Sequence, residues 1–93
     1  MRRIELSRLA GIDLDRLEAW LVANGAPYAS DLGDVLADAI DSLREFPERG
    51  RHSGFGELRE LIVPFRTWGY VVTYSVSVSS VIIARIHHGF EDR

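Results

Sequence analysis

The chain has 93 residues, of which eleven are basic, fourteen are acidic and none is cysteine. All eleven basic residues are arginine, lysine is absent, and the formal net charge is −3. This length predicts one domain with one modest core. The lack of cysteine excludes a disulfide framework and a thiolate zinc site. The negative charge argues against general nucleic-acid binding, which depends on the neutralisation of phosphates.

The charge is divided unevenly along the chain. Residues 1–46 carry five arginines and nine acidic residues, a net charge of −4, whereas residues 47–93 carry six and five, a net charge of +1. No apolar run approaches the ~20 residues of a membrane helix, and charged residues interrupt any signal-peptide core within the first eight positions. We therefore expect a cytoplasmic protein with no membrane partner.

The first half of the chain has the pattern of a short strand followed by a helix. Residues 3–7 alternate between polar and apolar side chains, which predicts a strand. Ser7 is the expected N-cap of the first helix, and Asp13 is an alternative because Gly11 weakens the first turn. The apolar stripe of this helix consists of Ala10, Leu14, Leu17 and Leu21.

A second helix is predicted after a stop at Asn24-Gly25, with Pro27 in its first turn. It ends before Pro47, because the residue that precedes a proline disfavours helix. The resulting helical hairpin spans about residues 8–46. Its second helix is acidic on the face opposite the apolar stripe, and this face is either solvated or meets a basic segment of a partner. The apolar positions are Leu32, Val35, Leu36, Ala39, Ile40 and Leu43, and the acidic ones are Asp31, Asp34, Asp38, Asp41 and Glu45.

The second half predicts a glycine-rich loop over residues 48–56 and then three strands. Turns are expected over residues 66–69, after a strand closed by Pro64, and at Ser79-Ser80. Consecutive strands with short links pair antiparallel. The prediction is therefore an α+β fold of order β-α-α-β-β-β, with the helical hairpin packed on a small antiparallel sheet over about residues 57–88. The strand-like runs are residues 57–63, 70–77 and 81–88.

Four segments of the second half resemble motifs of the RelE/ParE toxin family. Residues 45–51 (EFPERGR) resemble the EFPxxGR segment that ends the second helix of the family, and residues 56–65 (GELRELIVPF) resemble the LRELxVPF strand that follows. Residues 69–76 (GYVVTYSV) resemble GYVxxYxV, and residues 83–92 (IARIHHGFED) resemble the closing ILRVxHGREDW. Because the four motifs occur in the right order at the right separations, the chain is similar to the toxin of a type II toxin–antitoxin pair.

The resemblance implies the fold already predicted, over residues 1–93, with no cofactor and no metal. It implies a cognate antitoxin as partner in a toxin–antitoxin hetero-oligomer. ParE-like members of the family bind and inhibit DNA gyrase, whereas RelE-like members cut messenger RNA on the ribosome. The absence of lysine and the charge of −3 favour the ParE-like class, since docking on ribosomal RNA favours a basic surface. The alternatives are a RelE-like endoribonuclease and a non-toxic module that only binds the antitoxin.

The two activity classes predict different site residues. A metal-independent ribonuclease needs an acid, a base and cations around the scissile phosphate, whereas a ParE-like toxin needs no catalytic residue. Phe90 stands where the family pattern has arginine, so it either weakens the target contact or serves as an apolar anchor. The other interpretation of the paired histidines is that His88 closes the last strand and His87 is exposed. The ribonuclease candidates are Arg59, Arg66, Arg85, His87 and His88, and the target-binding candidates are Arg59, Arg66, Trp68, Arg85, His88 and Phe90.

A toxin must also offer an apolar surface to its antitoxin. Trp20 falls outside the apolar stripe of the first helix, so it either contacts a partner or covers the edge of a small core. The antitoxin-binding candidates are Leu17, Trp20 and Leu21. Metal binding is not expected, because His52 is far along the chain from the paired histidines, which point to opposite faces of a strand.

Overall fold

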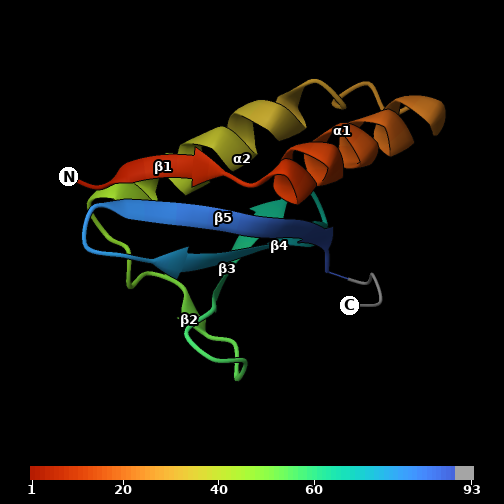
Figure 1. The fold of residues 1–93 in the computed structure, drawn as a ribbon. Coiled ribbons are helices and arrows are strands. Elements are labelled where there is room, and N and C mark those ends of the chain that lie inside the picture. The colour runs from red at the N-terminus through yellow and green to blue at the C-terminus, as the bar shows by residue number, and fades with distance from the viewer. Residues whose placement is uncertain (90–93) are drawn as a thin grey trace.

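The computed structural model describes residues 1–89, and it confirms the predicted α+β fold. Two helices lie on one face of a five-stranded sheet (Figure 1). The elements in chain order are β1 (Arg3–Leu6), α1 (Arg8–Ala23), α2 (Asp31–Asp41), the 3-10 turn η1 (Ser42–Arg44), β2 (Arg51–His52), β3 (Arg59–Phe65), β4 (Trp68–Val76) and β5 (Ser80–His88).

The sheet is mixed, in the order β1-β5-β4-β3-β2. The three strands predicted for the second half pair antiparallel as expected, and β2, which was not predicted, pairs antiparallel with β3. β1 lies parallel to β5, with Ile4 opposite Val81. The two helices between β1 and the rest of the sheet provide the crossover that a parallel pairing requires. The two-residue strand β2 lies within the predicted loop 48–56 and extends the other edge of the sheet.

The first helix begins where the sequence predicts. Ser7 is its N-cap, because the Ser7 Oγ accepts a hydrogen bond from the Ala10 N–H at 3.0 Å. The same hydroxyl donates to the Ala84 carbonyl on β5 at 2.7 Å. One serine therefore both starts α1 and attaches it to the last strand, and Asp13 is free for another role.

The second helix begins later than predicted. α2 starts at Asp31, and residues 27–30 form turns instead of a first helical turn at Pro27. The N–H of Asp31 donates to the Tyr28 carbonyl at 3.0 Å, which satisfies backbone groups that a helix would have paired. The longer connection places Tyr28 next to Phe65 at the end of β3, with ring centroids 5.6 Å apart.

Pro64 lies inside a strand, although the sequence predicted that it would end one. β2 pairs only with the first two residues of β3. Beyond these two residues, the side of β3 that faces away from β4 is an edge of the sheet. Proline is tolerated on an edge because no neighbouring strand there needs its missing N–H. The turn to β4 therefore contracts to residues 66–67, and Trp68 begins β4. Ser80, also predicted in a turn, begins β5 and is buried.

The core lies between the helices and the sheet. The stripes predicted for the two helices are mostly buried, and they pack against residues of β3, β4 and β5. The core residues include Ala10, Leu17 and Leu21 of α1, Leu32, Leu36 and Ile40 of α2, Leu43 of η1, and Leu61, Val63, Phe65, Tyr70, Val72, Tyr74, Val81, Ile83 and Ile86 of the sheet.

The segment that joins η1 to β2 is attached to the sheet by Tyr74. The Gly50 N–H donates to the Tyr74 hydroxyl at 2.8 Å, and that hydroxyl donates to the Pro47 carbonyl at 2.7 Å. Burial raises the pKa of Tyr74, which stays a neutral donor. A Cβ atom at position 50 would lie 2.5 Å from the hydroxyl oxygen and 2.9 Å from the Glu60 carbonyl oxygen. The close approach of Tyr74 therefore explains why glycine stands at position 50 of the 45–51 motif.

Candidate functional site

Arg85 is bound by a buried carboxylate of α1. Its Nε and Nη2 donate to the two Asp13 carboxylate oxygens at 2.8 and 3.0 Å, and the Ile86 N–H donates to Oδ2 at 2.9 Å. Asp13 is 2% exposed. Burial opposes its ionisation, but the hydrogen bonds from Arg85 and Ile86 hold the pKa of Asp13 below its usual value. This pairing joins residues 72 positions apart, and the sequence pattern did not predict it.

The Asp13 pair has a clear structural role. β1 ends at Leu6, opposite Ile83, so the following residues of β5 have no strand beside them on that side. The Asp13 carboxylate takes the place of a strand by accepting the Ile86 N–H. Arg85 is thus oriented by the fold, and its side chain is 41% exposed.

Arg59 holds the loop that precedes β3. Its Nη1 donates to the Gly50 carbonyl at 2.7 Å, and its Nη2 lies 3.4 Å from His52 Nε2. Arg59 begins β3 and Arg66 directly follows its last residue, which places their Cα atoms about 23 Å apart at ~3.3 Å per residue. The two arginines cannot act on one phosphate.

A row of side-chain rings from different segments lies beside the turn between β3 and β4, and we call it the aromatic row. Successive centroids lie 5.2 to 6.0 Å apart. The guanidinium carbon of Arg66 lies 4.3 Å from the centroid of the Tyr28 ring at one end of the row, which is a cation–π contact. The row contains, in spatial order, Tyr28, Phe65, Tyr70, His88 and Trp68. Three target-binding candidates, Arg66, Trp68 and His88, are therefore at one end of the sheet.

His88 is packed between two members of the aromatic row. Its ring lies 5.2 Å from both Trp68 and Tyr70. The following Gly89 N–H donates to the Gly69 carbonyl at 2.7 Å, and a Cβ atom at position 89 would lie 2.8 Å from that oxygen. These contacts fit the interpretation of His88 as the residue that closes the last strand.

His87 is partly buried, with its Nδ1 atom inside the protein, whereas the structural interpretation of the paired histidines expected it to be exposed. It lies opposite Val71 of β4, and its charge contributes to the lowered pKa of Asp13. The five ribonuclease candidates thus occupy three places: Arg59 at the loop, Arg85 and His87 near Asp13, and Arg66 and His88 in or beside the aromatic row. Phe90, the remaining target-binding candidate, lies outside the described residues.

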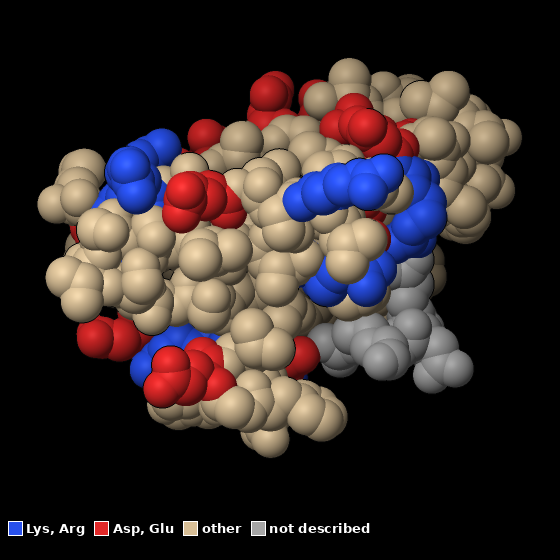
Figure 2. All heavy atoms as spheres, in the orientation of Figure 1, with Lys and Arg blue, Asp and Glu red and all other residues tan. Residues whose placement is uncertain are grey.

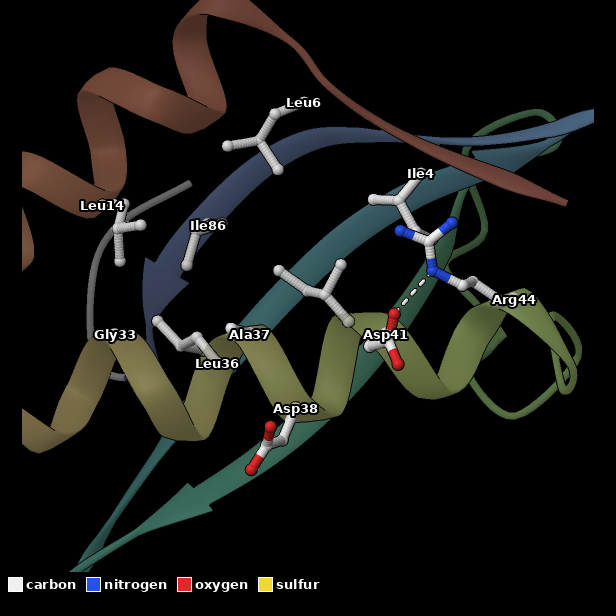
Figure 3. A pocket seen from close by; sticks show the side chains of 11 residues that line it. Ile4, Leu6, Leu14, Gly33, Leu36, Ala37, Asp38, Asp41, Arg44 and Ile86 are labelled. Atoms are coloured by element: carbon white, nitrogen blue, oxygen red, sulfur yellow. Dashed lines mark hydrogen bonds and ion pairs between the residues drawn. The ribbon is translucent and has the colours of Figure 1, made fainter.

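The helices and β1 enclose an apolar groove (Figure 3). Its volume is about 450 Å³. Ile4 and Leu6 of β1 and Leu14 of α1 lie above α2, Asp41 is paired with Arg44 at one end of the space, and the Asp38 side chain points away from it. The groove is lined by Ile4, Leu6, Leu14, Gly33, Leu36, Ala37, Asp38, Ile40, Asp41, Arg44 and Ile86.

The antitoxin-binding candidates of α1 do not line this groove. Leu17 and Leu21 are 5% and 3% exposed, so they belong to the core, and predicting them as partner contacts was wrong. In a domain this small, the apolar stripe of a helix is needed for the core itself. Trp20 is 60% exposed and remains a candidate contact on another face of α1.

The surface charge is patchy. Figure 2 shows arginine side chains in separate groups, with acidic side chains and wide uncharged areas between them. Among residues 1–89, no group of three or more potential metal ligands is found. No helix in this range is long and apolar enough to cross a membrane.

Comparisons with known proteins agree with this geometry. A family model described as "ParE toxin of type II toxin-antitoxin system, parDE" matches residues 4–93. The chain is 44% identical to Toxin RelE1 of Caulobacter vibrioides over 81 residues, covering 87% of this chain and 86% of that toxin. It is 38% identical to Toxin RelE3 of the same organism over the full length of both.

A solved structure of the chromosomal ParDE toxin–antitoxin system from P. aeruginosa has the same fold. Its TM-score is 0.79 at 22% identity, with 95% of this chain and 96% of that chain covered. The motifs, the element order and the family match agree, and the chain belongs to the ParE toxin family of type II toxin–antitoxin systems, within the RelE/ParE superfamily.

Proposed function

We propose that this toxin acts by binding and inhibiting DNA gyrase, without chemistry of its own. The observation that carries the proposal is that two of the cationic ribonuclease candidates are bound by the fold itself. Arg59 donates to a loop carbonyl and Arg85 to a buried carboxylate. General acid–base catalysis needs its groups within hydrogen-bond reach of one reacting centre, and these internal contacts of Arg59 and Arg85 argue against their use at such a centre.

The electrostatics support the same proposal. Ribosome-dependent cleavage requires docking on RNA, whose affinity comes largely from contacts between cations and phosphates. The chain has a net charge of −3 and no lysine, and its arginines form separate groups on the face shown in Figure 2. A protein target does not require a continuous basic surface.

The groove is our proposed site for the cognate antitoxin. Its floor is apolar, and on the α2 side it is bordered by Asp38, which points outward, and by Asp41, which is paired with Arg44. Such a groove fits an amphipathic segment that places apolar side chains on the floor and basic side chains beside α2. The ParDE system of P. aeruginosa pairs a toxin of this fold with an antitoxin, which supports a toxin–antitoxin hetero-oligomer for this chain.

The test separates the two activity classes. The toxin is expressed in the absence of the antitoxin, and the DNA-damage response and protein synthesis are followed from the moment of induction. Gyrase inhibition predicts induction of the damage response, and purified toxin should block supercoiling of relaxed plasmid by gyrase. Rapid translation arrest with cleaved messenger RNA, and unimpaired supercoiling, would contradict the proposal. Normal growth would favour the module that only binds the antitoxin.

The second candidate is a RelE-like ribosome-dependent endoribonuclease. It is favoured by the names of the two Caulobacter relatives, Toxin RelE1 and Toxin RelE3. In that case the double variant His87→Ala/His88→Ala should lose messenger RNA cleavage, measured by primer extension on ribosome-bound transcripts. Wild-type toxin that leaves such transcripts intact excludes this candidate.

A further inference from the structure

The backbone of Arg66 is in a conformation that side-chain-bearing residues seldom adopt. Arg66 and Thr67 form the two-residue turn between β3 and β4, and the φ of Arg66 is +58°. Within residues 1–89, Arg66 is the one residue other than glycine with a positive φ. Tight hairpins usually place glycine, asparagine or aspartate at such positions. Glycine would adopt this turn conformation with less strain than arginine does. Backbone strain of this kind is concentrated at functional sites.

The side chain of Arg66 is oriented rather than free to rotate. Its guanidinium stacks on the Tyr28 ring at 4.3 Å, and that ring packs edge-on against Phe65. Stacking occupies one flat face of the guanidinium and leaves its in-plane N–H groups directed outward. No carboxylate of residues 1–89 lies within ion-pair distance of Arg66. An oriented arginine edge matches the geometry of a carboxylate, which it binds through two parallel hydrogen bonds.

Trp68 gives the same end of the sheet an apolar contact. It begins β4 directly after the turn, is 43% exposed, and its ring is supported by His88 at 5.2 Å. Tryptophan and arginine are the residues most enriched among those that dominate the energy of protein interfaces. Both side chains here are held by rings of the aromatic row, so little conformational entropy is lost when a partner binds.

We propose that Arg66 and Trp68 form the surface through which this toxin recognises its target, which is a protein that presents a carboxylate next to an apolar recess. The inference rests on the proposed function in one respect, namely that the target is a protein. It adds the end of the molecule that makes the contact and the chemistry of the contacted surface. The groove residues include neither Arg66 nor Trp68, so target and antitoxin contact different residues.

The test compares three variants. Arg66→Gly removes the guanidinium and the backbone strain together, and Arg66→Lys keeps the charge but loses the planar fork. Arg51→Gln is the matched control, because it removes one exposed arginine at the other end of β3. Each variant is measured for inhibition of growth after induction, for affinity to immobilised gyrase, for affinity to the antitoxin and for melting temperature.

We expect Arg66→Gly to weaken growth inhibition and gyrase affinity at least tenfold, with an unchanged or higher melting temperature and antitoxin affinity within twofold of wild type. Arg66→Lys should lose part of the activity, and Arg51→Gln should lose none. Full toxicity of Arg66→Gly would overturn the inference, as would a parallel loss of antitoxin binding. Binding to DNA or RNA that depends on Arg66 would also overturn it, because the recognised group would then be a phosphate.

The outcomes separate this inference from the proposed function. If wild-type toxin inhibits gyrase and Arg66→Gly inhibits it equally, the inference fails and the function stands. Wild-type toxin could instead leave gyrase activity unchanged, while its growth inhibition still requires Arg66 and Arg66 contributes to no binding of DNA or RNA. In that case the choice of gyrase as target fails and the recognition surface stands.

Discussion

Replacement of Asp13 by alanine removes the carboxylate that binds Arg85 and the Ile86 N–H. Leaving a buried N–H without a partner costs ~1–3 kcal/mol. Breaking a fully buried ion pair costs ~3–5 kcal/mol, but the Arg85 side chain is 41% exposed and regains water, so we assign ~1 kcal/mol to that part. The expected loss of unfolding free energy is therefore about 3 kcal/mol.

A loss of this size is large for a domain of 93 residues. Each kcal/mol lowers the melting temperature of such a domain by ~4–8 °C, so thermal unfolding of Asp13→Ala should occur roughly 12–24 °C below wild type. Asp13→Asn keeps one acceptor oxygen and should lose about half as much. The control is Asp15→Ala on the same helix, where Asp15 is exposed and the change should stay within ~0.5 kcal/mol.

The pH dependence gives a second measurement on the same pair. The pKa of Asp13 is lower in the folded protein than its reference value of 3.8, so its contribution to stability is fully present above that value. This contribution is lost as the pH falls through the folded-state pKa. The stability difference between wild type and Asp13→Asn should hold from pH 7 to about pH 4 and shrink below. A difference under ~0.5 kcal/mol at pH 7 would refute the reasoning, because it would mean that the pair is not needed to complete the β5 edge.

Three further changes test other parts of the structure by denaturant unfolding and titration calorimetry. Gly50→Ala should lower the unfolding free energy by ~2 kcal/mol or more, because its Cβ would lie 2.5 Å from the Tyr74 hydroxyl; unchanged stability would contradict the tight packing there. Gly11→Ala should raise it by ~0.5–1 kcal/mol, since a helical Cβ at that position meets nothing within 4 Å; a loss would contradict the placement of that turn. Ala37→Arg places a bulky cation in the groove and should weaken antitoxin binding at least tenfold, or ~1.4 kcal/mol. Ala19→Arg on the exposed side of α1 is its control, and equal effects of the two would argue against the groove as the antitoxin site.

The local parts of the fold were predictable from the sequence. The Ser7 cap, the apolar stripes of both helices and the antiparallel order of the last three long strands depend on residues close together in the chain. Helical periodicity and turn chemistry report such short-range relations directly. The position of Pro64 was misjudged because a proline ends a central strand but not an edge strand, and the alternating pattern of β3 does not say whether a neighbour lies beside it.

The candidate site was less predictable, because its contacts are long-range. Asp13 was noted as a possible helix cap, and nothing in its surroundings in the sequence indicates Arg85 as its partner. Tyr28 was not considered at all, although it orients Arg66. Leu17 and Leu21 were assigned to a partner, whereas the protein's own core needs them. Residue type identified the turn arginine and tryptophan as candidates, but the packing of the aromatic row that brings them together with His88 depends on the tertiary fold.

The parallel pairing of β1 with β5 sets an order on folding during synthesis. Ile4 pairs with Val81, so the first strand has no partner strand until β5 has been translated. The same late strand supplies Arg85 to Asp13 and the Ala84 carbonyl to Ser7. A nascent chain that stops before Ser80 therefore lacks the neighbour of β1, one of the two neighbours of β4, and the two hydrogen-bonded attachments of α1 to β5. The first strand and first helix therefore reach their final contacts only after β5 has been translated, and a product that ends before Ser80 lacks these contacts.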